Sequence, residues 1–260
     1  MTTATVGSLL KEWRGRRRRS QMDLALDAGV SPRHLSFVET GRARPSPELV
    51  LALADHLEVP LRFRNTLLLA AGYAPRFHET ALSDPAMDAV RRSLALVLDR
   101  HDPYPGVVLD RRWDVVMANG AAGRLVALLP PSLQEPVNMF RASLHPDGFA
   151  AVTRNFAEWG SYLVRQLRRL VVLTGDDDLR ALEDEVRGYP GVQALVGHPD
   201  WSDWSDPPVL VRCELTLGDA DLALFTTLTT FGTPRDITLD ELAIELFYPA
   251  DDATEALLRA

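Results

Sequence analysis

The stretch SQMDLALDAGVSPRHLSFVETGRARPSPE, residues 20–48, decides the fold of the first part of the chain. Gln21 begins a run whose apolar positions fall on one face of a helix, and Gly29 follows where the chain must reverse direction. Ser31 is placed to cap a second helix. Pro32 then occupies its first position, where the N–H group that proline lacks has no helical partner to lose. The stretch therefore predicts two short helices joined by a tight turn.

The second of these helices has a polar outer face. Only Leu35 and Val38 are spaced to face inward, and Thr40-Gly41 ends the helix. A helix of about ten residues with a polar, arginine-bearing face suits the major groove of DNA. The pattern is typical of a helix-turn-helix that reads double-stranded DNA. Its candidate contact residues are Gln21, Ser31, Pro32, Arg33, His34, Ser36, Phe37, Arg42 and Arg44.

The flanking sequence extends this motif into a small helical domain. Amphipathic spacing predicts a first helix over residues 6–17, a fourth helix starting at Ser46 and a fifth starting at Pro60. Turn-forming residues dominate positions 72–85, which favours a linker there. The expected organisation is a five-helix domain over residues 1–72, a linker over 73–86 and a second domain over 87–260.

The second domain mixes helix and strand patterns. Helices are expected over residues 87–100, 121–129, 150–172 and 177–187, and strands over 107–110 and 113–118. Two β-rich runs, 209–217 and 222–231, read as a hairpin. Thr238 and Glu241 form a capping box that predicts a last helix over residues 239–247.

The charge of the chain is divided unevenly along its length. The net charge is −8, yet residues 1–75 carry 11 basic and 7 acidic side chains, whereas the remaining residues carry 17 and 29. A basic first part joined to an acidic body is what a DNA-contacting module attached to another kind of domain should show.

Cysteine content and hydropathy narrow the class further. Cys213 is the single cysteine of the chain, which excludes an internal disulfide and a zinc site made of several cysteines. We interpret it as a buried, inert thiol. No run of about eighteen apolar residues occurs, so no membrane association is expected. A reduced, cytoplasmic protein is the prediction.

Three histidine–carboxylate pairs raise an enzyme as an alternative. They are His101 with Asp102, His145 with Asp147, and His198 with Asp200. No metalloprotease, nucleophile-elbow or P-loop motif accompanies them, and His-Pro-Asp also favours turns. We therefore expect no catalytic residues, no metal and no cofactor. Two alternatives stay open: an enzyme with a DNA-binding head, and a ligand-independent regulator that acts through protein interactions.

Two resemblances cover nearly the whole chain. Residues 6–71 resemble the Cro/repressor-type (XRE) helix-turn-helix family. Residues from about 88 onward resemble the MmyB-like ligand-binding domain that follows such modules in actinobacterial regulators. The second resemblance rests on three ordered strings, HDPYPGVVLDRRWDVVMANGAA (101–122), SLHPDG (143–148) and FGTPRDITLDELAIELFYPAD (231–251). It implies an α+β, PAS-like fold in which an antiparallel sheet and flanking helices enclose an apolar pocket.

The first resemblance assigns roles within the motif. It implies that Gln21 bonds a phosphate and that Arg14 and Glu39 form a structural ion pair. The residues that it implies meet base edges are Pro32, Arg33, Ser36 and Phe37. Phe37 has an alternative role as part of the module's own core. Modules of this kind bind near-palindromic operators as homodimers, so a homodimer is expected.

The second resemblance, together with composition, suggests what the pocket binds. The expected ligand is an apolar small molecule, and a long-chain acyl compound fits the lining. The candidate lining residues are Trp113, Met117, Phe140, Trp159, Tyr162, Leu163 and Phe225. The predicted function is that of a one-component transcription regulator.

Overall fold

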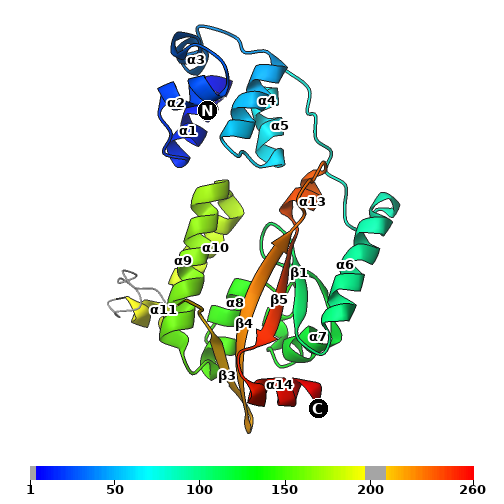
Figure 1. Ribbon diagram of the computed structural model, residues 1–260. Coiled ribbons are helices and arrows are strands. Elements are labelled where there is room, and N and C mark those ends of the chain that lie inside the picture. The colour runs from blue at the N-terminus through cyan, green and yellow to red at the C-terminus, as the bar shows by residue number, and fades with distance from the viewer. Residues whose placement is uncertain (1–3, 197–208) are drawn as a thin grey trace. The chain divides into compact units, whose positions relative to one another are not determined.

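The structure is a computed structural model that describes residues 4–196 and 209–260 (Figure 1). The chain divides into two units. The first comprises residues up to Thr80 together with 172–174 and 233–240, and the second comprises the remainder. Within the described ranges, no helix is long and apolar enough to cross a membrane.

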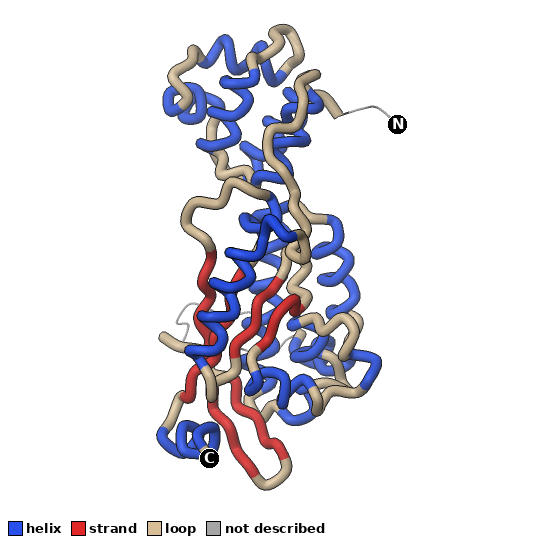
Figure 2. Tube along the Cα trace, turned by 90° about the vertical axis from the view of Figure 1, so that its right-hand side faces the viewer, coloured by secondary structure: helices blue, strands red, loops and turns tan. Residues whose placement is uncertain are grey.

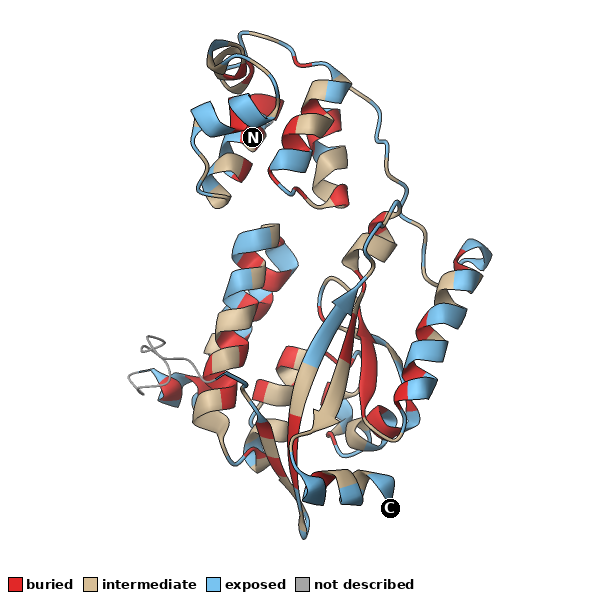
Figure 3. Cartoon of the chain, in the orientation of Figure 1, coloured by how far each residue is buried: buried red, intermediate tan, exposed pale blue. Residues whose placement is uncertain are grey.

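Five helices form the N-terminal part of the chain: α1 (Val6–Arg16), α2 (Gln21–Asp27), α3 (Pro32–Glu39), α4 (Pro47–His56) and α5 (Leu61–Ala70). Side-chain caps explain where the first four begin. Thr5, Ser20, Ser31 and Ser46 each accept a hydrogen bond from a backbone N–H of the first helical turn. The apolar faces meet in one core, which includes Leu10, Trp13, Leu24, Leu35, Val38, Leu53 and Leu57 (Figure 3).

Two glycines make the chain reversals on either side of α3. Gly29, between α2 and α3, has a φ of 66°, and Gly41, after α3, has a φ of 74°. This left-handed region is strained for residues with a Cβ, which explains why glycine stands at both positions. The predicted helix-turn-helix is confirmed.

A five-stranded sheet forms the centre of the C-terminal part. Its strands are β1 (Gly106–Leu109), β2 (Val115–Ala118), β3 (Cys213–Leu217), β4 (Ala220–Thr230) and β5 (Ala243–Pro249). The strand order is β2-β1-β5-β4-β3, and every neighbouring pair is antiparallel. The last strand in sequence therefore lies in the middle of the sheet.

Further helices follow α5 in the described part of the chain. They are α6 (Asp88–His101), α7 (Gly120–Val126), α8 (Met139–Leu144), α9 (Phe156–Thr174), α10 (Asp177–Arg187), α11 (Pro190–Leu195), α13 (Ile237–Glu241) and α14 (Asp252–Arg259), with short 3₁₀ turns at Pro85–Met87, Pro131–Leu133 and Phe149–Val152. The helix α6 crosses one face of the sheet (Figure 2). Its Leu94 and Leu98 pack with Val108 and Ile244 of that face. The opposite face packs on α8, α9 and α10. The predicted α+β class is confirmed.

The expectation of a last helix over residues 239–247 is wrong. The helix α13 ends at Glu241, residues 243–249 form β5, and the terminal helix α14 follows. Because β5 is a central strand covered on both faces, its sequence AIELFYP is nearly continuously apolar instead of alternating. Such a run is not distinguishable from a buried helix by periodicity.

Smaller differences also have local causes. The helix expected from residue 150 begins at Phe156, because residues 149–152 form a 3₁₀ turn. The strand expected from residue 209 begins at Cys213. Trp113, expected in a strand, has a φ of 65° in the turn between β1 and β2. The short helices α8 and α11 were not anticipated, since six residues give too little periodicity.

Candidate functional site

The outer face of α3 is the first candidate surface. Ser31 fixes the start of this helix, because its Oγ accepts a hydrogen bond from the backbone N–H of His34 at 3.1 Å. Leu35 and Val38 are buried beneath the helix. The predicted contact residue Arg33 is exposed, while Pro32, His34, Ser36 and Phe37 are half-buried.

An aromatic ring between two arginines marks this surface. The guanidinium carbon of Arg33 lies 5.4 Å from the centre of the Phe37 ring, and that of Arg42 lies 5.9 Å from it. The backbone N–H of Arg42 donates to the Phe37 carbonyl oxygen at 2.7 Å, which holds the chain after α3 against the helix. Phe37 is not part of the core formed by the described helices. It therefore supports the two cations at the surface.

Arg14 and Glu39 join α1 to the end of α3. Arg14 donates to both carboxylate oxygens of Glu39, from Nε at 2.8 Å and from Nη2 at 3.0 Å. The Glu39 side chain is only 4% exposed. The hydrogen bond with Glu39, together with its charge, raises the pKa of Arg14 against the opposing effect of burial. A bidentate pair of this kind fixes the orientation of the helix that carries the surface.

Gln21 also belongs to this pair. Its side-chain amide donates to Glu39 Oε2 at 2.9 Å, so α2 is tied to the same carboxylate. The contact of Gln21 with a phosphate stays a prediction. The structure itself gives this side chain a positioning role beside Arg14.

Arg44 differs from Arg42 in what it contacts. Its Nε donates to the Ala71 carbonyl at 3.1 Å, its Nη2 donates to the Gly72 carbonyl at 3.3 Å, and its guanidinium lies over the Tyr73 ring. These contacts satisfy carbonyls at the end of α5. Sequence reasoning placed both arginines on the DNA surface, whereas the structure gives Arg44 a partner inside the domain.

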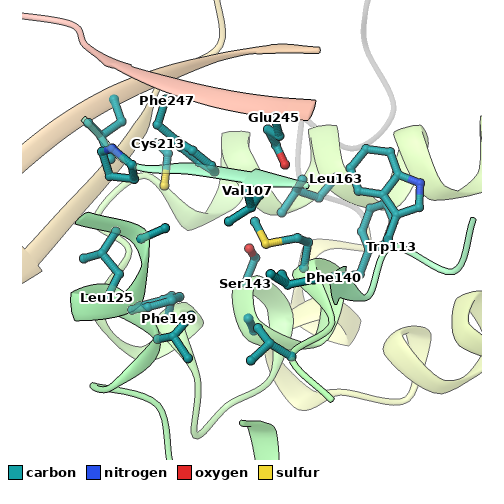
Figure 4. A pocket seen from close by; sticks show the side chains of 18 of the residues that line it. Val107, Trp113, Leu125, Phe140, Ser143, Phe149, Leu163, Cys213, Glu245 and Phe247 are labelled. Carbon is teal, nitrogen blue, oxygen red and sulfur yellow. The ribbon is translucent and has the colours of Figure 1, made fainter. Parts of the chain in front are cut away.

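An apolar cavity of about 80 Å³ lies on the α9 side of the sheet (Figure 4). Five of the seven side chains expected to line a pocket do line it: Trp113, Phe140, Trp159, Tyr162 and Leu163. Trp113 and Phe140 pack against each other with ring centres 4.8 Å apart, and Trp159 stacks on Tyr162 at 5.4 Å. Side chains of α7, α8 and all five strands also contribute to the wall.

Met117 and Phe225 lie outside the cavity, contrary to expectation. The pairing of β1 with β2 changes register between Val108, opposite Met117, and Leu109, opposite Val115. This bulge turns Met117 away from the cavity wall formed by Val115, and Met117 packs with the α6 cluster. Phe225 follows the lining residue Leu224, so strand alternation turns it to the other face, where it stacks on Tyr248.

Glu245 is the acidic residue among the described residues that line this cavity, and it was not identified from the sequence. It lies in the middle of β5, is 6% exposed, and directs its carboxyl group into the cavity (Figure 4). Burial raises the pKa of Glu245 to about 7, against a smaller opposing effect of a hydrogen bond with Thr226. The sequence signal was an acidic residue inside the apolar run AIELF. Because that run was predicted to be a helix, its acidic side chain could have faced solvent and needed no buried position.

The other ionisable groups in the cavity wall are Tyr162 and Cys213. Burial raises the pKa of the Tyr162 hydroxyl, and the charge of Glu245 acts in the same direction. Burial likewise raises the pKa of the Cys213 thiol to about 12, with added effects of Glu245 and Glu214. Cys213 is accordingly a protonated thiol at neutral pH.

The histidines of the two described histidine–carboxylate pairs occupy structural positions. His101 is hydrogen bonded through Nε2 to the Phe247 carbonyl at 2.7 Å and is packed against Tyr104 and Tyr248. The backbone N–H of Asp147 donates to His145 Nδ1 at 3.1 Å, which closes a turn. His198 and Asp200 lie outside the described residues.

Comparisons with known proteins match both parts of the chain. Residues 90–260 match the MmyB-like transcription regulator ligand binding domain, and residues 5–67 match a helix-turn-helix domain. Similar curated proteins include uncharacterised HTH-type transcriptional regulators of Mycobacterium bovis and of two strains of Mycobacterium tuberculosis. Each is 32% identical over 102 residues, which is 39% of this chain. The match spans only 40% of the length of these relatives.

Proposed function

The chain belongs to the MmyB-like transcription regulators, with a helix-turn-helix domain followed by a ligand-binding domain, and we propose that it is a one-component regulator. In this proposal, α3 reads an operator and the cavity of the C-terminal unit binds an apolar small molecule. The observation that carries the proposal is the arginine-flanked outer face of α3, formed by Arg33, Phe37 and Arg42.

Arg33 has the chemistry for reading a base. It is exposed and bears a planar fork of donors that suits the O6 and N7 atoms of guanine. Phe37 lies next to it and offers an apolar surface to a thymine methyl group. Helix-turn-helix modules contact two half-sites about one helical turn apart. The operator is therefore proposed to be an inverted repeat bound by a homodimer.

The cavity supports an apolar ligand. Its wall is formed mainly by aliphatic and aromatic side chains, which favour apolar over polar molecules. A fatty-acyl-like compound is the candidate that composition suggests. Because the cavity measures about 80 Å³, a long chain would enter only with rearrangement of the wall. A regulator that works solely through protein contacts has no need of such a cavity.

The experiment that tests this proposal is a selection of genomic fragments by the purified full chain. We expect enrichment of an inverted repeat, and binding that weakens by orders of magnitude as salt rises from low to moderate concentration. The variant Arg33→Ala should lose this enrichment. Arg100→Ala, which removes an exposed arginine of α6 and therefore changes the charge equally, is the control and should enrich the same sequence as wild type. A folded protein that enriches no sequence, with or without cell extract, contradicts the proposal.

A further inference from the structure

Glu245 occupies an unusual place for an acidic residue. It lies in the central strand β5, opposite Val107 of β1 and Leu228 of β4. Its neighbours Ile244 and Leu246 face the α6 side of the sheet, so strand alternation turns Glu245 to the cavity. A carboxyl group is thus held, almost without exposure, in an apolar wall.

One oxygen of this carboxyl group lacks a partner. Thr226 supplies a hydrogen bond to the group, but Glu245 Oε2 is buried and has no hydrogen-bond partner among the described residues. An unsatisfied buried acceptor is destabilising, and more so when it carries charge. A ligand that donates a hydrogen bond to Oε2 would remove this penalty, which makes Glu245 an anchor directed into the cavity.

The rest of the wall leaves this negative charge unbalanced. No lysine, arginine or histidine is found among the described residues that line the cavity. The other titratable side chains there, Tyr162 and Cys213, are neutral at pH 7, since their ordinary pKa values are alkaline and burial raises them further. Aromatic faces are abundant, in contrast, and aromatic faces attract cations. They belong to Trp113, Phe140, Phe149, Trp159, Tyr162 and Phe247.

We propose that the cavity selects an apolar molecule carrying a protonated amine, which donates a hydrogen bond to Glu245 Oε2. This inference rests on the proposed ligand-binding function and adds the chemistry of the head group. A carboxylate at the same place would face the charge of Glu245 with no cation to offset it. An amine is therefore preferred over the carboxylic acid of the same chain length.

The test uses three probes of equal chain length: hexylamine, 1-hexanol and hexanoate. Their binding to the full chain is measured by titration calorimetry at pH 8, where Glu245 is ionised and hexylamine is protonated. We expect hexylamine to bind at least about tenfold more tightly than either other probe, as charge-assisted hydrogen bonds are the stronger ones. Glu245→Gln should abolish this preference and leave 1-hexanol binding unchanged.

Glu214→Gln is the matched control. Glu214 is an acidic residue of β3 that lies outside the cavity wall, 3.7 Å from Arg154. The Glu214→Gln protein should still bind hexylamine more tightly than 1-hexanol and hexanoate. Equal binding of hexanoate and hexylamine, or a preference that survives in Glu245→Gln, overturns the amine proposal while leaving an apolar ligand site. Failure of all three probes to bind contradicts the amine proposal and the proposed apolar ligand site together, and leaves the proposed reading of DNA by α3 unaffected.

Discussion

Gly7 of α1 lies against the backbone of Val38 in α3. A Cβ atom at position 7 would stand 2.4 Å from the Val38 carbonyl oxygen and 2.6 Å from that of Glu39. These are backbone atoms, so no side-chain rotation relieves the overlap. The close approach of the two helices therefore depends on the absence of a side chain at residue 7.

Gly7→Ala should accordingly separate α1 from α3. Overpacking of this kind lowers the free energy of unfolding by about 1–3 kcal/mol. Denaturant unfolding measures the change. Gly15→Ala, in the same helix with nothing within 4 Å of its Cβ position, is the control. It should be neutral or stabilising, because alanine favours helix over glycine. Equal effects of the two substitutions would show that the contact is not tight.

Glu39 connects three helices through one carboxylate. Glu39→Ala leaves Arg14 and Gln21 without their shared partner, and we expect a loss of about 2–4 kcal/mol in the free energy of unfolding. Glu12→Ala removes an exposed carboxylate that pairs with Arg16 in the same helix, and it should cost less than about 0.5 kcal/mol. Similar losses in thermal or denaturant unfolding would argue against a positioning role for Glu39.

Arg42 and Arg44 should separate DNA affinity from stability. Arg44→Ala loses the hydrogen bonds to the end of α5, so we expect a decrease of about 1 kcal/mol in the free energy of unfolding. Arg42→Ala should leave stability within about 0.5 kcal/mol. It should instead reduce the slope of DNA affinity against salt by about 1. If Arg42→Ala lowers stability and Arg44→Ala reduces the salt slope instead, Arg44 contacts DNA and Arg42 has the structural role.

Glu245 gives the protein a specific pH dependence. Its folded-state pKa of about 7 exceeds the ordinary value of 4.5, so the folded state holds the proton more tightly than the unfolded state. Stability should therefore be lost as pH rises through this interval, by roughly 3 kcal/mol in total.

The measurement is the free energy of unfolding of wild type relative to Glu245→Gln between pH 4.5 and 8. The comparison cancels the titration of other groups. The free energy of unfolding of the wild type should fall relative to that of the variant as pH rises to about 7. Above that pH, the difference between the two should become constant. A difference that does not change with pH would mean that this carboxyl group is not desolvated.

Local signals in the sequence were enough for the helical part of the chain. Ser31 and Gly41 mark the limits of α3 through capping and a left-handed turn, both of which depend on neighbouring residues alone. The strand β5 depends instead on partners more than a hundred residues away in β1, since Val107 pairs with Glu245. Its apolar run fitted a helix equally well.

The candidate sites show the same division. Four aromatic residues of the cavity were predicted from the sequence, whereas Phe149 and Phe247 were not. The bulge beside Val115 places Met117 on the opposite face of the sheet, and no residue type in that stretch indicates a bulge. Glu245 could not be placed in the cavity from the sequence, because β5, the strand that carries it, was predicted to be a helix. The partner of Arg44 likewise required knowing where α5 ends.

The central claim is that α3 reads DNA through Arg33. The most direct measurement is the affinity of wild type and Arg33→Ala for the selected operator and for a copy with one half-site guanine replaced, followed by fluorescence anisotropy. The account predicts that wild type discriminates between the two by roughly 1–3 kcal/mol, and that Arg33→Ala loses the discrimination while remaining folded. If Arg33→Ala discriminates as well as wild type at every guanine of the half-site, α3 does not read DNA through Arg33.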